Sequence, residues 1–307
     1  MPTHPTIPAE TPAAPSPPRN IAIIINPAAQ SARASRHVET VRTLAAGARL
    51  VETRAAGDAR RLAQELAGEG CDIVVAAGGD GTINEVAAGL LEADGEAVPA
   101  LGLLPLGTMN VFAVELGLPA AHLDGCWQRI LAGRSREIDV WRAGKHVFVQ
   151  MAGVGLDATV IQQTSWESKK KWGPLSYLGT LTQVLDRPPQ ELRISVDDGP
   201  WLTGTNALLG NGRFYGGPFS VFPAARNDDG WLDIVLIHGH GPATFSKRVA
   251  DVLLNEIDDD REGVTRLRGQ RVRIEAPCPI PFEIDGELGD ETPLVVARHE
   301  RRLRVIV

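Results

Sequence analysis

A glycine-rich segment that carries one acidic residue has the composition of a phosphate-binding turn. It reads Gly78-Gly79-Asp80-Gly81-Thr82 and follows an apolar run, Ile73–Ala77, with the length and β-branched content of a buried strand. Glycines let the backbone approach a ligand closely, and a helix that begins after them presents free N–H groups and a positive dipole end. The carboxylate between the glycines indicates that a metal ion or an acceptor hydroxyl lies nearby, so we expect phosphate chemistry at this turn.

The segment after this turn has the pattern of a helix. Apolar residues recur at helical spacing from Ile83 to Leu91, and Thr82 with Glu85 has the spacing of a capping box, which predicts a helix that begins at Thr82. A glycine-rich strand-to-helix junction taken alone is also compatible with a tight turn that binds nothing.

Two more strand ends resemble this junction. Pro105–Asn110 spans the junction of a predicted strand, Leu101–Leu106, and a predicted helix, Thr108–Leu116. The first predicted strand, Ile21–Pro27, carries Asn26 near its end. Because ligands of parallel sheets bind beyond the carboxyl ends of the strands, we expect the three turns to share one edge. Two helix N-termini at that edge would suit a polyphosphate, although each turn alone could be an ordinary connection.

The elements that position these turns alternate along the first part of the chain. Ala32–Ala46 and Asp58–Ala67 have helical spacing, and Arg49–Thr53 between them has a strand pattern. Alternating strands and helices predict an α/β domain over residues 20–137 with a parallel sheet covered on both faces. Residues 1–19 are rich in Pro, Ala and Thr, which favours a disordered tail without a catalytic role.

Residues 138–307 have a different pattern, in which short alternating strands separated by turns predict a β-rich, sandwich-like second domain. Two helical segments, near 173–186 and 242–256, interrupt it. The expected strands are His146–Met151, Glu191–Val196, Thr205–Leu209, Trp231–Ile237, Val272–Glu275, Pro281–Asp285, Leu294–Ala297 and Leu303–Val307.

The bulk composition excludes several classes of protein. A formal net charge of −7 argues against wholesale nucleic-acid binding, and no apolar stretch reaches the length of a membrane span. The three cysteines lie far apart without metal-ligand spacing, which favours reduced thiols and a cytoplasmic location. The seven histidines likewise show no paired-ligand spacing.

Taken together, the motifs resemble those of the diacylglycerol-kinase-type lipid kinases, which include bacterial lipid kinases and sphingosine and ceramide kinases. The glycine-rich hallmark of that family alone is also found in NAD kinases, but here the set is ordered and spans residue 21 to about residue 305. Its members are Gly78–Glu85, Pro105–Asn110, Gly153–Asp157, Gly210–Gly217, Pro223–Ala224, Asp228–Gly230 and Asp285–Glu287.

This resemblance implies a two-domain kinase, with an NAD kinase/diacylglycerol kinase-like first domain, that transfers the γ-phosphate of ATP to the hydroxyl of a diacylglycerol-like or sphingoid lipid. Thr53 matches a nucleotide-contacting threonine of the family by spacing only. The implied nucleotide-binding residues are Asn26, Thr53, Gly78, Gly79, Asp80, Gly81, Thr82, Asn84, Glu85, Gly107, Thr108 and Asn110.

The resemblance also implies the catalytic residues. Glu287 would take the proton from the lipid hydroxyl, with Asp285 beside it, and Asp80 would lie near Mg²⁺–ATP or the acceptor hydroxyl. The sequence leaves open which of Asp80 and Glu287 is the general base. From spacing alone, Asp285-Gly286-Glu287 is equally typical of a hairpin turn.

A structural Mg²⁺ loop is a further implication of the resemblance. The Asp229 carboxylate and the backbone carbonyls of Arg226 and Trp231 occupy the positions of its ligands, and oxygen ligands suit a hard cation. Spacing alone favours a plain Asp-Gly turn.

Two departures from the family pattern leave the nucleotide pose and the lipid preference open. Gln30 replaces the glycine of the first loop, and Val111 replaces an acid after Asn110. These departures leave a non-catalytic nucleotide- or lipid-binding regulator as one alternative function. The glycine-rich hallmark shared with NAD kinases leaves an NAD kinase with a soluble acceptor as the other.

A lipid substrate requires contact with a membrane surface. The segment Trp166–Leu178 mixes lysines with aromatic and leucine side chains, as at a lipid interface, although a solvated surface helix fits equally well. We therefore expect peripheral contact with the inner face of the membrane, and the sequence leaves the oligomeric state open, a homo-oligomer included. The GxGxxA match at Gly153–Ala158 lacks the context of a dinucleotide site, and Asp258–Asp260 has the pattern of a solvated loop.

Overall fold

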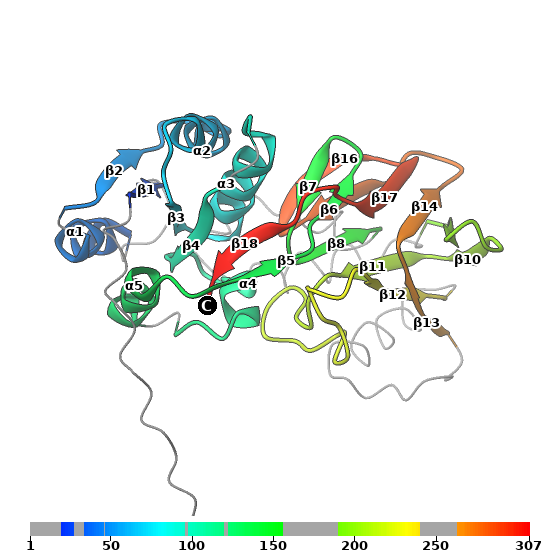
Figure 1. Cartoon of the computed structure of the whole chain (residues 1–307). Coiled ribbons are helices and arrows are strands. Elements are labelled where there is room, and N and C mark those ends of the chain that lie inside the picture. The colour runs from blue at the N-terminus through cyan, green and yellow to red at the C-terminus, as the bar shows by residue number, and fades with distance from the viewer. Residues whose placement is uncertain are drawn as a thin grey trace, which may run out of the picture.

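The computed structural model describes residues 20–27, 34–45, 47–95, 98–119, 122–155, 190–239 and 263–307 (Figure 1). Several predictions concern residues outside this description. They are the tail 1–19, Gln30, the start of the helix predicted at 32–46, the segment Trp166–Leu178, the helices near 173–186 and 242–256, and Asp258–Asp260.

The first part of the chain is the predicted α/β domain. Its sheet, sheet A, has the strand order β2-β1-β3-β4-β18-β5, in which β5 alone runs antiparallel to its neighbour. The helices α2 and α3 lie on one side of this sheet, and α1 and α5 lie on the other (Figure 1). The strands are β1 (Ile21–Ile25), β2 (Arg49–Glu52), β3 (Ile73–Gly78), β4 (Ala100–Pro105), β5 (Ser135–Ile138) and β18 (Leu303–Ile306), and the helices are α1 (Ala34–Leu44), α2 (Asp58–Gly68), α3 (Asp80–Glu92), α4 (Val111–Glu115) and α5 (Leu123–Ala132).

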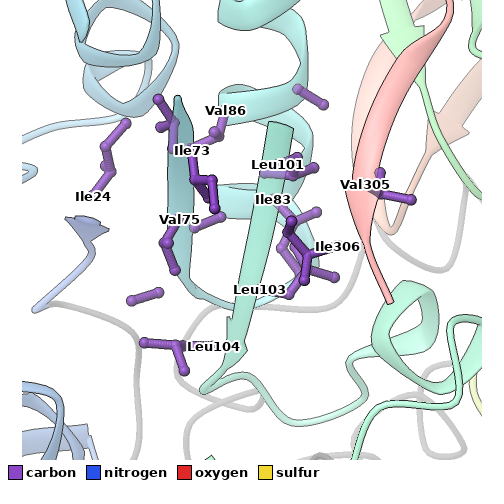
Figure 2. Close-up of a cluster of buried hydrophobic side chains, with 14 of the residues drawn as sticks. Ile24, Ile73, Val75, Ile83, Val86, Leu101, Leu103, Leu104, Val305 and Ile306 are labelled. Atoms are coloured by element: carbon purple, nitrogen blue, oxygen red, sulfur yellow. The ribbon is translucent and has the colours of Figure 1, made fainter. Parts of the chain in front are cut away.

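The hydrophobic core of this domain explains why its central strands are almost wholly apolar. β3 and β4 are covered on both faces, and every residue of both strands is buried. Figure 2 shows Val75 and Leu104 from these strands, together with Ile83 of α3 and Ile306 of β18, in one cluster of buried side chains. Burial of each large aliphatic side chain contributes about 1.5–3 kcal/mol, so this cluster holds the ends of β3 and β4 in fixed positions.

The second part is a sandwich of two antiparallel sheets. Sheet B has the order β10-β9-β14-β17-β6-β7, and sheet C has the order β13-β12-β11-β8-β15-β16. The side chains between them include Trp141, Phe148 and Phe282, all of which are buried. The strands are β6 (Trp141–Ala143), β7 (His146–Phe148), β8 (Met151–Val154), β9 (Leu192–Val196), β10 (Leu202–Gly204), β11 (Asn206–Gly210), β12 (Leu232–Ile237), β13 (Val264–Gly269), β14 (Arg271–Glu275), β15 (Pro281–Ile284), β16 (Glu287–Glu291) and β17 (Leu294–Arg298).

The last strand of the chain belongs to a different sheet from the one that its position predicts. β18 pairs with β4 and β5 in sheet A and not with the strands of the sandwich. The chain therefore passes between the two parts twice, once after β5 and once before β18. Its apolar residues Leu303 and Val305 complete the core of the α/β domain, which is the physical reason for the return.

Candidate functional site

The three predicted turns meet at the carboxyl edge of sheet A. The turns after β3 and β4 are in backbone contact, because a Cβ atom added to Gly107 would lie 2.5 Å from the Cα atom of Gly79. The first turn joins them through Asn26, whose Nδ2 donates to Oγ1 of Thr82 at 3.3 Å. Thr53, at the end of β2, donates its N–H to Ile25 at 3.0 Å beside the same edge.

Helix α3 begins earlier than its capping-box pattern predicts. It starts at Asp80 with Gly79 as its N-cap, so Thr82 lies within the first turn and caps nothing. Thr82 instead fills the space beside Gly78, where an added Cβ would lie 2.5 Å from the threonine Oγ1. The predicted capping box is therefore wrong, and a helix N-terminus opens directly from the glycines with its first N–H groups outside the helical ladder.

Glu85 contacts the beginning of α2. Its Oε1 accepts the N–H of Gly57 at 2.9 Å, and its Oε2 accepts the N–H of Ala59 at 3.1 Å. A carboxylate in this position satisfies amides that a helix N-terminus leaves unpaired and is favoured by the helix dipole. Glu85 therefore caps a neighbouring helix, and its expected place in a nucleotide site stays a prediction.

In the turn after β4, the side chain of Asn110 is hydrogen-bonded to the backbone of Gly107. Asn110 has a left-handed backbone (φ 50°), its Oδ1 accepts the N–H of Gly107 at 2.9 Å, and its Nδ2 donates to the carbonyl of the same residue at 2.9 Å. Helix α4 consequently begins at Val111, three residues later than predicted, and Thr108 stays exposed in the turn. Val111, which departs from the family pattern, is buried.

Asp80 faces the first turn of α4 across the site. Its Oδ1 lies 3.5 Å from the N–H of Phe112. Burial, followed by the negative charge of Asp285, raises the pKa of Asp80 to about 6, although the nearby backbone N–H groups oppose the shift. The expectation that two helix N-termini point at one phosphate chain is therefore wrong for α4, since its amides face a carboxylate.

Asp285 and Gly286 form the turn of the β15–β16 hairpin, and both have a positive φ, as a two-residue turn of this kind requires. The Asp285 carboxylate is buried and points away from solvent. It accepts the backbone N–H groups of Val149, Gln150 and Met151 at 2.9–3.0 Å and Nδ2 of Asn84 at 2.8 Å. Burial raises the pKa of Asp285.

These bonds explain a second difference from the sequence pattern. The strand predicted over His146–Met151 is divided into β7, in sheet B, and β8, in sheet C, because Asp285 binds the amides between them. Asn84 also donates to the carbonyl of Val147 at 2.7 Å, so α3 is tied to this crossing. Asp285 and Asn84 thus hold the sandwich against the glycine-rich helix.

Glu287 is the first residue of β16 and is exposed. It lies against the helix N-terminus of the other domain, because a Cβ atom added to Gly81 would be 2.8 Å from Oε1 of Glu287 and 3.3 Å from its Cδ. The structure therefore brings together Glu287, Asp80 and the glycine-rich turn, which lie about 200 positions apart in the sequence.

Two buried polar residues that the sequence motifs do not include complete the surroundings. Glu115 of α4 accepts the N–H of Arg213 at 2.7 Å and Nε2 of Gln150 at 3.3 Å. Gln150 also donates to the carbonyl of Phe214 at 2.9 Å, and its Oε1 is buried without a hydrogen-bond partner. The sequence signal for Glu115 is a charged residue on the buried side of an otherwise apolar helix.

In the predicted metal loop, the carboxylate of Asp229 is hydrogen-bonded to other groups of the protein. Asp229 Oδ1 accepts the N–H of Trp231 at 3.1 Å, and its Oδ2 is bound by Nη2 of Arg268. Among the described residues, no three His, Cys, Asp or Glu side chains are grouped to hold a metal. As arranged here, the donor set around Asp229 does not fit Mg²⁺, because an arginine occupies its carboxylate.

None of the helices that the structure describes combines the length and hydropathy needed to cross a bilayer.

Comparison with known proteins agrees with this architecture. The family model of the diacylglycerol kinase catalytic domain matches residues 20–143, and that of the YegS C-terminal NAD kinase beta sandwich-like domain matches residues 150–307. In the solved structures, a candidate diacylglycerol kinase from Bacillus anthracis str. Sterne superposes with a TM-score of 0.79 over 97% of this chain and 98% of its own, at 24% identity. At that identity the likeness concerns the fold.

Two curated relatives share more of the sequence. A protein named Probable lipid kinase YegS from Escherichia fergusonii is 34% identical over 236 residues, which cover 75% of this chain and 76% of that protein. Its namesake from Salmonella arizonae is 36% identical over the same shares of the two chains. With one domain model over each half and these relatives, the chain belongs to the family of lipid kinases that carry a diacylglycerol kinase catalytic domain and are similar to YegS.

Proposed function

We propose that this protein transfers the γ-phosphate of ATP to the free hydroxyl of a diacylglycerol-like or sphingoid lipid. One observation carries the proposal. The Glu287 carboxylate lies against Gly81, at the positive N-terminal end of α3. An acid from one domain and a helix end of the kind that suits phosphate from the other therefore face the same space.

In this proposal the triphosphate lies along the carboxyl edge of sheet A. The amides at the start of α3 and the exposed turn at Thr108 would hold phosphate oxygens, and Asn26 and Thr53 would flank the nucleotide. The close approach of Gly79 and Gly107 supports this arrangement, because side chains there would fill the space between the two turns.

Asp80 is the residue that would hold a Mg²⁺ ion delivered with ATP. Its pKa is raised partly by the charge of Asp285, so a cation beside this pair of carboxylates would be favoured. When bound, Mg²⁺ would neutralise charge on the phosphates. Asn84, Asp285 and Glu115 would act by position, since they hold α3, the β7–β8 crossing and α4 together.

Glu287 is the proposed general base. The lipid hydroxyl oxygen would attack the γ-phosphorus, its proton would pass to the Glu287 carboxylate, and the bond between the γ-phosphorus and the bridging oxygen would break to leave ADP. The exposure of this carboxylate next to the helix end supports the proposed role, because an exposed group can meet a substrate that arrives from solvent or from a membrane surface.

Asp80 is the alternative base, and amide variants distinguish it from Glu287. Activity should fall below about pH 6 in either case, because Asp80 becomes protonated there whether it takes the proton or holds Mg²⁺. If Glu287 is the base, the Glu287→Gln variant should lose turnover, whereas Asp80→Asn should chiefly weaken the use of Mg²⁺–ATP.

The lipid acceptor implies peripheral contact with a membrane. We keep Trp166–Leu178 as the predicted contact segment because its lysines and aromatic residues suit a headgroup region.

The experiment that tests the proposed function is transfer of label from [γ-³²P]ATP to lipid, followed by thin-layer separation. The panel contains diacylglycerol, monoacylglycerol, ceramide and sphingosine, and NAD tests the rival reaction. Labelled lipid from wild type but not from Glu287→Ala supports the proposal. Labelled NADP alone would assign an NAD kinase, and ATP binding without any labelled product would assign a regulatory protein.

A further inference from the structure

The loop Arg226–Trp231 joins the two passages of the chain between the domains. The backbone carbonyl of Asn227 accepts the N–H of Asp139 at 2.7 Å, and its Oδ1 accepts a hydrogen bond from Nη1 of Arg136 at 2.7 Å. Arg136 lies in β5, and Asp139 directly follows it. On the returning passage, Arg302 donates to the carbonyl of Asp228 at 2.8 Å. The position of this loop therefore bears on how the domains are held together.

Asp139 connects the same loop to both passages from within the protein. Its Oδ2 accepts the N–H of Gly230 at 2.6 Å, and its Oδ1 lies 3.2 Å from Nε of Arg302 and 3.8 Å from Nη1 of Arg298. Asp139 is 1% exposed. Its buried charge is thus compensated by arginines, and the pairing of aspartate with arginine recurs around the loop.

Arg268 of β13 completes the pattern at the position where the family resemblance implies a metal. Its Nη2 binds Oδ2 of Asp229, its Nε lies 3.5 Å from Oδ2 of Asp233, and its guanidinium carbon lies 5.7 Å from the centre of the Trp231 ring. One guanidinium therefore neutralises two carboxylates and covers an aromatic face.

This arrangement conflicts with a divalent cation on Asp229. Mg²⁺ requires oxygen ligands at about 2.0–2.1 Å in near-octahedral geometry. Here one carboxylate oxygen accepts a backbone N–H, and the other is bound to a group that is itself positive. A cation added at this place would have to displace Arg268 or remain close to its charge, and either change is unfavourable.

We propose that Arg268 takes the place of the structural metal ion, so that the loop between the domains is held by a built-in cation and needs no divalent metal. A guanidinium suits this role because it is always protonated and presents several donors in a fixed plane. The proposal is independent of the kinase activity, since it concerns the folded chain without nucleotide.

The test is thermal unfolding of the full chain, without nucleotide, in MgCl₂ or in EDTA. Five proteins are compared: wild type, Arg268→Gln, Asp229→Asn, the double variant and the matched control Arg271→Gln. Arg271 is a suitable control because it is an exposed arginine on β14, the next strand along the chain. For each protein, the Mg²⁺ effect is the Tm in MgCl₂ minus the Tm in EDTA. Only the part of this difference that the Asp229→Asn substitution removes is counted, because Mg²⁺ bound near Asp80 would not depend on Asp229.

The proposal predicts no such Mg²⁺ effect in wild type or in Arg271→Gln. Arg268→Gln should melt about 2–4 °C lower in EDTA and should regain most of this loss in MgCl₂, because Asp229 and Asp233 are then free to attract Mg²⁺. The double variant should not regain it. A Mg²⁺ effect in wild type that Asp229→Asn removes would overturn the proposal, and so would an Arg268→Gln variant whose Tm is the same in MgCl₂ and EDTA.

Discussion

Gly81→Ala offers a direct test of the contact between Glu287 and the glycine-rich helix. Gly81 lies in the first turn of α3, and its backbone does not require glycine, because its φ is not in the left-handed region. An added Cβ would lie 2.8 Å from Oε1 of Glu287, which is shorter than an ordinary contact. Glu287 is exposed, so its carboxylate can withdraw, and the displacement needed is about 0.5–1 Å.

The expected effects on stability and catalysis therefore have opposite signs. Alanine is favoured over glycine in a helix by about 0.5–1 kcal/mol, so the free energy of unfolding should be unchanged or slightly higher. A displacement of about 1 Å in a reacting group can lower the rate about 100-fold. We therefore predict a fall in kcat of about 10- to 100-fold. ATP affinity is measured separately, because the added Cβ points toward the space proposed for the γ-phosphate.

The assay combines urea unfolding, ATP binding and steady-state lipid phosphorylation on the same preparations. Gly68→Ala is the matched control, because Gly68 ends α2 and an added Cβ there meets nothing within 4 Å. The control should keep the kcat of wild type. If Gly81→Ala is folded and also keeps that kcat, the reasoning about Glu287 is refuted.

Three other variants test separate parts of the site. Asp80→Asn should be more stable than wild type at pH 7.5 by up to about 3 kcal/mol. The reason is that the pKa of Asp80 is raised from 3.8 to about 6, so the wild type loses stability as the pH rises through that interval. Urea unfolding curves of the two proteins that differ equally at pH 4 and at pH 7.5 would contradict this. Glu287→Ala should lower kcat by about 100- to 10,000-fold and leave the ATP dissociation constant nearly unaltered, and calorimetry showing a large loss of ATP affinity would count against a base that acts on the acceptor. Glu85→Ala should lower the free energy of unfolding by about 0.5–2 kcal/mol, because Gly57 and Ala59 lose their acceptor; unchanged urea unfolding would show that this cap is not stabilising.

Local patterns in the sequence predict the elements of the α/β domain well. The β-branched runs at Ile21–Ile25 and Ile73–Ala77 become central strands, and the glycines after the second run form the turn onto α3. The reason is that strand burial and glycine-rich turns depend mainly on neighbouring residues. The boundaries are less predictable, as the start of α4 at Val111 illustrates, because Asn110 closes its turn on Gly107 by side-chain bonds.

Contacts between distant segments could not be predicted from spacing. Glu85 caps a helix that begins at Asp58, and Asp285 divides a predicted strand by binding the amides of Val149 and Gln150. β18 returns to sheet A because its apolar residues complete that core. In each case the partner is decided by tertiary packing, which the sequence of either segment alone does not encode.

A structure with a non-hydrolysable ATP analogue and Mg²⁺ would show directly where the nucleotide binds. We predict that the triphosphate lies on the N–H groups at the start of α3, with the γ-phosphate on the side of Gly81 that faces Glu287. A nucleotide bound elsewhere, or a γ-phosphate that Glu287 cannot approach through an acceptor hydroxyl, would contradict it.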